Sequence, residues 1–157
     1  MPHLHSPASQ VVVYGHSFVS RLQRYCSSNT KHNLQLNSTT RVVSFVSVPG
    51  LCIHQLHIHL DQVLLDTPRV VLIDVGTNDL HNDSSQPQLL ARKVFEFAQS
   101  LIAAGVHRVI ILEVLFRSSQ GRFAAHSVSS FMLAAHRYNN VVKSLVTSIP
   151  ISARSVY

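Results

Sequence analysis

Short apolar runs alternate with amphipathic stretches along most of the chain. Runs rich in β-branched residues cover 11–14, 41–48, 70–75 and 109–114, and glycine or Pro-Gly follows the first three, which is typical of buried strands that end in turns. Apolar residues at helical spacing predict helices over 17–26, 53–65, 89–104 and 131–145. This alternation predicts an α/β fold, a three-layer α/β/α sandwich with a parallel sheet of four to five strands, the fifth beginning in 151–157.

The chain has the size of one ordinary domain. Its 157 residues are 46% apolar, enough for one core. We expect residues 1–10 to be a flexible N-terminal segment and residues 11–157 to form a single domain. No apolar run approaches the roughly 20 residues of a bilayer span, and the first ten residues lack the pattern of a secretory signal. We therefore expect an intracellular, cytoplasmic protein with no membrane partner.

Charge and cysteine content narrow the function only a little. The formal charge of +6 favours acidic partners, but the basic residues are scattered rather than clustered as in a nucleic-acid groove. Cys26 and Cys52 have no CxxC spacing, which argues against a disulfide framework and a structural zinc site. We expect two reduced thiols.

Three polar motifs follow the first three predicted strands: Gly15-His16-Ser17, Pro49-Gly50 and Gly76-Thr77-Asn78-Asp79. The carboxyl ends of parallel strands share one edge of a sheet, so a Ser, a Gly and an Asn from these motifs can converge there. A serine nucleophile with hydrogen-bond donors nearby is the core of an acyl-transfer site. Such a serine also needs a base to take its proton.

In order and sequence, these motifs resemble the SGNH, or GDSL-like, hydrolase superfamily, named for the Ser, Gly, Asn and His of its four blocks. The resemblance runs from Val11 to about Tyr138; the residues 11–17, 48–50 and 75–79 match the first three blocks. It implies a flavodoxin-like sheet and a serine ester hydrolase, similar to esterases, lipases or acetylesterases, that forms an acyl-enzyme on Ser17. It further implies an oxyanion hole made by the main-chain N–H groups of Ser17 and Gly50 and the side-chain amide of Asn78. No cofactor is implied, and the partner is a small ester or acetylated substrate.

Two departures from the family pattern stand out. His16 replaces the usual Asp before the nucleophile, which removes a carboxylate near Ser17. The family's last block, Asp-x-x-His, occurs nowhere in the sequence. In the family it lies on the loop after the fifth strand, so we expect truncation: the rest of the last strand, this loop and the final helix are missing. The chain as given should then be weak or inactive, since it lacks the base His.

The same departures favour an alternative from another class. A catalytically inactive SGNH-like binding module would keep the fold without the base, and related domains occur in mobile-element proteins whose partner is nucleic acid. The basic charge is compatible with this alternative, although the scattered basic residues give it weak support. Steep salt dependence of nucleic-acid binding would favour it.

Other residues invite site hypotheses of their own. His126 and His136 are candidate substitute bases, and Arg117 is a candidate contact for an acidic or polar substrate group. His54, His57 and His59 invite a metal hypothesis, but no nearby carboxylate or Cys completes an open three-ligand site. We predict a solvated helix face there and no metal.

Overall fold

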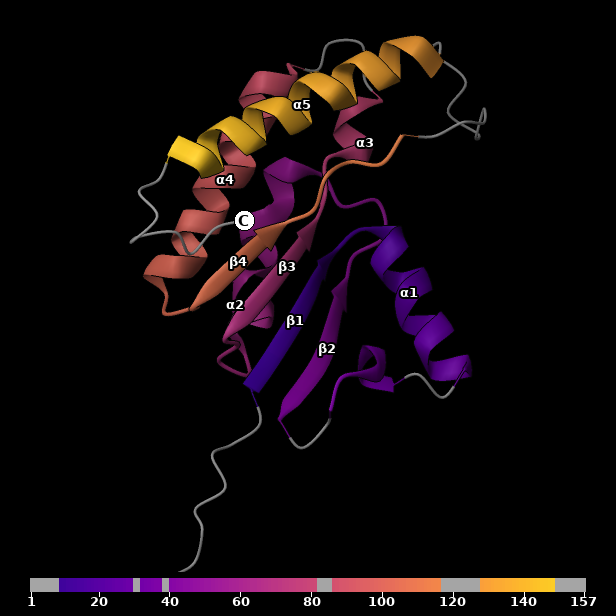
Figure 1. The fold of residues 1–157 in the computed structure, drawn as a ribbon, viewed down its shortest axis with the longest axis vertical. Coiled ribbons are helices and arrows are strands. Elements are labelled where there is room, and N and C mark those ends of the chain that lie inside the picture. Colours follow the sequence, from indigo (N-terminus) through magenta and orange to yellow (C-terminus); the bar gives the residue numbers. More distant parts are fainter. Residues whose placement is uncertain (1–8, 30–31, 38–39, 82–85, 117–127, 149–157) are drawn as a thin grey trace, which may run out of the picture.

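The computed structural model describes residues 9–29, 32–37, 40–81, 86–116 and 128–148, and places four parallel strands in one sheet (Figure 1). These are β1 (Ser9–Gly15), β2 (Arg41–Ser47), β3 (Val70–Asp74) and β4 (Arg108–Ile111). Their order across the sheet is β2-β1-β3-β4, and each neighbouring pair is parallel. The predicted α/β fold with a parallel sheet is confirmed.

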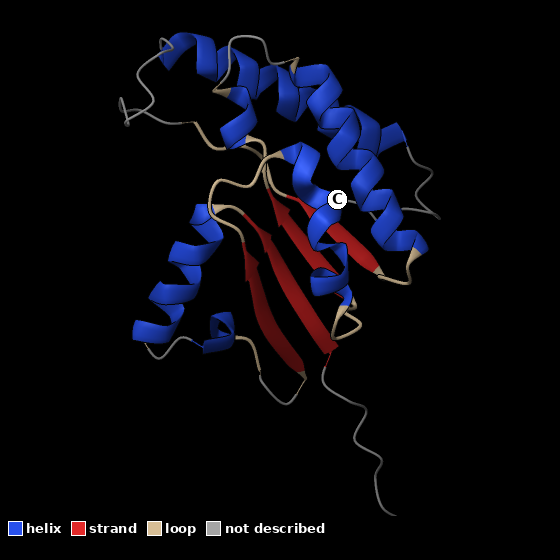
Figure 2. Cartoon of the chain, turned by 180° about the vertical axis from the view of Figure 1, so that it is seen from behind, coloured by secondary structure: helices blue, strands red, loops and turns tan. Residues whose placement is uncertain are grey.

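Helices lie on both faces of this sheet (Figures 1 and 2). One face carries α1 (Ser17–Ser28), which contacts β1 and β2. The other carries η2 (Ile53–His59), α2 (Leu60–Leu64), α4 (Pro87–Ala103) and α5 (Val128–Ser148), with α4 packed against η2, β4 and α5. Among these described helices, none combines the length and the apolar character that a membrane span requires.

Side chains alternate between the two faces along β1, as strand geometry demands. Val12 and Tyr14 join the main core, where the Tyr14 ring lies 6.0 Å from that of Phe97 on α4. Val13 is buried outside this core, as is Val19 of α1. A strand buried on both faces reads as a continuous apolar run, which is why 11–14 was recognisable in the sequence.

Two predicted elements differ from the observed ones. The segment 53–65 is not one α-helix: it begins as the 3₁₀-helix η2, because the N–H of Gln55 donates to the carbonyl of Cys52 at 3.0 Å, an i+3 bond. The fourth strand ends at Ile111 rather than Val114. Its partner β3 ends at Asp74, so the ladder closes with the bond from Leu112 N to Ile73 O.

Two short helical elements were not predicted from the sequence: η1 (His32–Gln35) and α3 (Thr77–Leu80). The predicted fifth strand in 151–157 lies outside the described residues.

Candidate active site

Main-chain hydrogen bonds tie together the carboxyl ends of three strands. Val48 N donates to Gly15 O at 2.9 Å, which joins the ends of β2 and β1. His16 N donates to Asp74 O at 3.3 Å, which joins the ends of β1 and β3. The three motifs that follow these strands therefore lie along one edge of the sheet.

Ser17 occupies the first position of α1 and is half-buried. The N–H of a first helical residue has no acceptor within its helix, and the positive end of the helix dipole lies at the same place. The preceding residue, His16, caps the helix: its Nδ1 accepts a hydrogen bond from Phe18 N at 3.2 Å. Ser17 thus sits where a developing negative charge would be stabilised.

Pro49 and Gly50 form the middle of a tight turn. Leu51 N donates to Val48 O at 3.1 Å, with Gly50 at a φ of +77°. Proline at the second position and a positive φ at the third are the features of a type II turn. A Cβ on Gly50 would meet nothing within 4 Å, so the backbone conformation rather than crowding requires glycine. The Gly50 N–H takes no part in the turn bond.

The third motif fastens this turn to α3. The side-chain amide of Asn78 donates to Leu51 O at 2.9 Å, across 27 residues of sequence. The Asp79 carboxylate accepts from Ile53 N, at 3.1 Å to Oδ1 and 3.2 Å to Oδ2. An amide NH₂ carries two hydrogens, so the bond to Leu51 holds Asn78 in place and leaves a second donor.

Burial dominates the electrostatics of this junction. It raises the pKa of Asp79, while the hydrogen bond from Ile53 and the charges of His54 and Lys93 act in the opposite direction. Burial, followed by the charge of Asp79, also raises the pKa of the Cys52 thiol. The unliganded thiol therefore stays protonated and is a poor nucleophile.

His16, the residue before the nucleophile position, faces a carboxylate from the neighbouring strand β3. The buried His16 ring directs Nε2 toward Asp74, 3.6 Å from Oδ1. Because Nδ1 accepts from Phe18, the ring hydrogen lies on Nε2 and points to this carboxylate. His16 thus replaces the family's Asp in sequence, and its own ring faces a carboxylate that comes from the end of β3.

A pocket of about 420 Å³ opens beside His16 and Asp74, at the ends of β1, β3 and β4. Much of its wall is apolar, with Phe18, Leu115 and Phe116 substantially exposed. Its remaining lining residues are His16, Arg21, Asp74, Thr77, Leu112 and Glu113. An apolar group of modest size fits this place next to the start of α1.

The histidine stretch after the turn agrees in part with its prediction, since His54 and His57 are exposed as on a solvated face. His57 packs edge-on against Phe97 at 5.0 Å, and His59 lies 6.3 Å from the Tyr14 ring, so these two rings cover the core. His54 lies with Cys52 and Asp79, one ligand atom of each within 4.8 Å of the others. The argument that no Cys or carboxylate joins this stretch is therefore wrong.

The other candidates lie away from this junction or outside the described residues. His136 is exposed on α5, and its Nε2 contacts Asn140 of the same helix at 2.9 Å. Arg117 and His126 fall outside the described residues. Both cysteines are free.

Three residues were missed as members of the site: Asp74, Cys52 and Asp79. Asp74 carried a signal, since it is the one charged residue in the apolar run 70–75. Asp79 belongs to the third motif, but nothing in the sequence pairs it with Cys52, because 27 residues separate them and only the strand order brings them together.

Solved structures with the same arrangement of elements supply an independent comparison. A GDSL-like lipase from Bacteroides thetaiotaomicron matches 90% of this chain with a TM-score of 0.64 at 18% identity. The chain has the fold of the GDSL-like hydrolases. It spans about two thirds of that lipase, 66% of its length.

Two further solved structures, both of esterases, match the fold of this chain. The psychrotrophic esterase EstA from Pseudoalteromonas matches 95% of this chain, and 76% of its own, with a TM-score of 0.60 at 13% identity. An acetyl xylan esterase, AlAXEase, matches 88% of this chain, and 73% of its own, with a TM-score of 0.58 at 15% identity. No protein-family model and no curated protein sequence matches the chain. The likeness to the GDSL-like hydrolases is therefore one of fold.

Proposed function

We propose that this chain carries the ester-binding and nucleophilic half of an SGNH-type serine ester hydrolase. In the proposed reaction, Ser17 Oγ bonds to the carbonyl carbon of an ester, its proton passes to a base, and the alcohol leaves. Water then hydrolyses the acyl-enzyme. The observation that carries the proposal is the hydrogen-bond network that holds the Gly50 turn against Asn78 beside the start of α1.

Three donors are proposed to bind the oxyanion: Ser17 N–H, Gly50 N–H and Asn78 Nδ2. The first is free of helix bonding by its position, the second is unused in its turn, and the third keeps one hydrogen after bonding Leu51. Donors fixed before the reaction stabilise the developing charge without reorganisation, and each is worth about 3 to 4 kcal/mol of barrier.

The apolar pocket at the start of α1, which is lined by the two neighbours of Ser17, His16 and Phe18, is proposed to take the acyl or alcohol part of a small ester. Phe18, Leu115 and Phe116 offer apolar surface, and the volume of about 420 Å³ suits a small group. Arg21 and Glu113, which also line it, offer charges to polar substituents. Acetylated compounds and short-chain esters are the substrate class with which to begin.

The base that the resemblance implies, the His of an Asp-x-x-His block, has no counterpart in the sequence. His16 engages one ring nitrogen with Phe18 and turns the other to Asp74, so it is not oriented to take the Ser17 proton. Asp-x-x-His is absent from the sequence. We therefore propose that the chain as given reacts about 10⁴-fold or more slowly than a chain with the complete catalytic set, because the members of such a set act together.

Covalent labelling with a fluorophosphonate tests the proposal directly. The probe reacts with an activated serine and mimics the oxyanion, and added imidazole supplies a base. We expect slow, imidazole-stimulated labelling that disappears in Ser17→Ala and falls by about 10² to 10³-fold in Asn78→Ala. Mass spectrometry of the labelled peptide locates the adduct.

The matched control is Ser20→Ala, one turn further along α1. It should label like the wild type. Labelling that survives Ser17→Ala, or a wild type that remains unlabelled with imidazole, would contradict the proposal.

The alternative, an inactive binding module with the same fold, is favoured by His16 and by the missing Asp-x-x-His. Under this alternative, the fluorophosphonate does not label Ser17. Nucleic-acid retention that falls steeply with salt would support it, because released counterions make such binding salt-dependent.

A further inference from the structure

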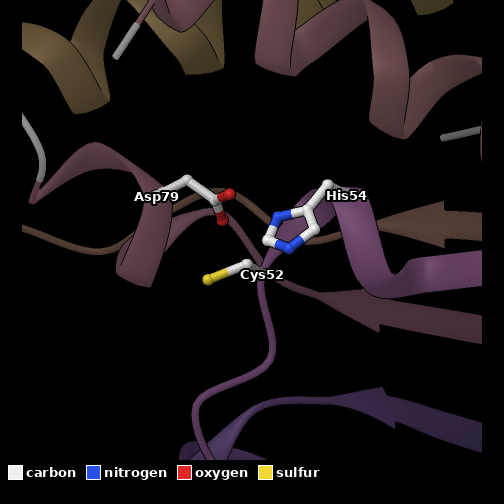
Figure 3. A group of neighbouring side chains, drawn as sticks. All are labelled: Cys52, His54 and Asp79. Carbon is white, nitrogen blue, oxygen red and sulfur yellow. The ribbon is translucent and has the colours of Figure 1, made fainter. Parts of the chain in front are cut away.

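Three side chains with metal-binding atoms gather where the turn after β2 meets α3. Figure 3 shows Cys52, His54 and Asp79 around a common space, the first two at the start of η2 and the third on α3. The thiol sulfur, one imidazole nitrogen and one carboxylate oxygen all lie within 4.8 Å of one another. None of the three is among the oxyanion donors proposed above.

We propose that this cluster binds a zinc-class divalent ion through Cys52 Sγ, a ring nitrogen of His54 and the carboxylate of Asp79, with the fourth position open. A thiolate, an imidazole and a carboxylate are ligands that Zn²⁺ accepts together. Ca²⁺ and Mg²⁺ prefer oxygen ligands alone, so the sulfur and nitrogen disfavour them. Three protein ligands with an open fourth position leave room for a water or an exogenous ligand.

The geometry requires only a modest closure of the cluster. Zinc bonds of about 2.0 to 2.3 Å place tetrahedral ligands about 3.3 to 3.8 Å apart, which is somewhat closer than the 4.8 Å limit of the cluster. His54 is exposed and Cys52 only half-buried. The Cys52 thiol donates to Gly50 O at 3.5 Å, and this bond is lost when the thiol gives up its proton to bind a metal.

Asp79 is the fixed member of the set. Its two oxygens accept from Ile53 N at 3.1 and 3.2 Å, so a main-chain donor already orients the carboxylate. Outer partners of this kind orient metal ligands and strengthen binding. The arrangement is therefore one oriented ligand with two adjustable ones.

An ion here would fasten the same two segments that the Asn78 and Asp79 hydrogen bonds join. Cys52 lies two residues after Gly50, and Asp79 directly follows Asn78. Bound metal would thus stabilise the position of the turn relative to α3. This expectation concerns binding and stability, and it stands whether or not Ser17 is a nucleophile.

Cobalt titration of the metal-free chain tests the site, since Co²⁺ replaces Zn²⁺ and reports its ligands by absorption. We expect one Co²⁺ per chain, a thiolate-to-cobalt charge-transfer band in the near ultraviolet, and displacement by Zn²⁺. We also expect Zn²⁺ to raise the melting temperature. Cys52→Ser should abolish the band, and His54→Ala should weaken Zn²⁺ binding by more than the roughly 10 to 100-fold typical of losing an outer partner.

Two matched controls separate this site from casual binding by the other histidines and the other thiol. His57→Gln changes a neighbour in the same stretch, and Cys26→Ala removes the second cysteine; both should retain the band and the affinity. Absence of the band in the wild type, its persistence in Cys52→Ser, or equal losses in His54→Ala and His57→Gln would each overturn the proposal. None of these results depends on labelling at Ser17.

Discussion

Two groups of residues at the carboxyl ends of the strands, here called the turn side and the pocket side, differ in how firmly their side chains are held. On the turn side, comprising the turn with Gly50 together with Asn78 and Asp79, side chains grip the main chain through bonds of 2.9 to 3.2 Å. On the pocket side, where His16 faces Asp74, the ring and the carboxylate approach only to 3.6 Å, and a pocket of about 420 Å³ opens beside them. The turn side is preorganised by its own sequence, whereas the pocket side is open.

This difference bears on how such a site works. Donors that are fixed in advance need no partner and no conformational change to act, so they can be complete in a chain that has no base. A base must reach the serine oxygen within about 3 Å. In the proposed function, the turn side would bind the carbonyl oxygen without a base, and activation of Ser17 would be a separate requirement.

The largest expected effect is at Gly15, where the two sides meet. A Cβ there would lie 2.3 Å from Asp74 O and 2.9 Å from Val19 Cγ2, so main chain has to move. We expect Gly15→Ala to lower the unfolding free energy by about 3 kcal/mol or more, as measured by urea denaturation. Gly105→Ala is the control, with a positive φ but no atom within 4 Å of its Cβ, and should cost about 1 to 2 kcal/mol. Equal losses in the two variants would refute the claim of a shared, crowded strand end.

The next largest loss of stability is expected when the hydrogen bonds that hold the turn side are removed. Asp79→Ala leaves Ile53 N without its acceptor, which should cost about 1 to 3 kcal/mol. Asp79→Asn keeps an acceptor oxygen and should cost less. Thermal unfolding in the presence of a chelator measures both, and the exposed Asp66→Ala should stay within about 0.5 kcal/mol of the wild type. If Asp79→Ala were as mild as Asp66→Ala, the turn would not depend on this carboxylate.

Alkaline pH should weaken the protein through two tyrosines buried in the main core, Tyr14 and Tyr138. Burial raises the pKa of both Tyr14 and Tyr138, and the charges of Asp79 and Asp74 add to the rise at Tyr138. In the unfolded chain tyrosine ionises near pH 10. The folded state then holds more protons above that pH, so the stabilisation present below about pH 10 is lost as the pH rises.

We expect the unfolding free energy to fall by about 1.4 kcal/mol per pH unit for each buried tyrosine. Tyr138→Phe should flatten this slope. Denaturation curves from pH 9 to 11, roughly spanning the tyrosine range, measure it, and an unchanged slope in the variant would exclude a contribution from Tyr138.

The smallest effect comes from the same two tyrosines at neutral pH, where removal of each hydroxyl should have a different result. Tyr14 OH donates to Leu56 O at 3.2 Å, so Tyr14→Phe should cost about 1 kcal/mol. Tyr138 OH is buried and has no hydrogen-bond partner among the described residues. Tyr138→Phe should therefore be neutral or slightly stabilising, within about 0.5 kcal/mol, because it removes a polar atom that gains nothing from burial. A larger loss for Tyr138→Phe than for Tyr14→Phe in urea denaturation would reverse the comparison.

The fold was predictable because local and global signals agree. The run 11–14 is apolar on both faces and ends at Gly15, and Leu90, Val94, Phe97 and Leu101 repeat at helical spacing. Burial selects both patterns directly: Val12, Tyr14, Val94 and Phe97 are all buried. The helix predicted over 53–65 was wrong at its start, since apolar spacing does not distinguish an i+3 from an i+4 bond at Cys52.

The site was less accessible to sequence reasoning. Ser17, Gly50 and Asn78 each follow a strand, so their shared edge could be anticipated, but their roles remain predictions. The Asp74 carboxylate beside His16 depends on the register that pairs Gly15 with Asp74. The cluster of Cys52, His54 and Asp79 depends on how the turn folds over α3. Such contacts between distant residues leave no local pattern.

The turn at Gly50 has a consequence for chirality. Its φ of +77° is unfavourable for an L-residue, yet the space around the position is open. The residue at this position is therefore restricted by the chirality that a positive φ favours and not by its size. D-alanine, whose preferred φ is positive, should be accepted where its mirror image L-alanine, of the same volume and polarity, is strained. A semisynthetic protein with D-alanine at this position would keep the N–H direction of the turn, and the two enantiomers would separate stereochemistry from size.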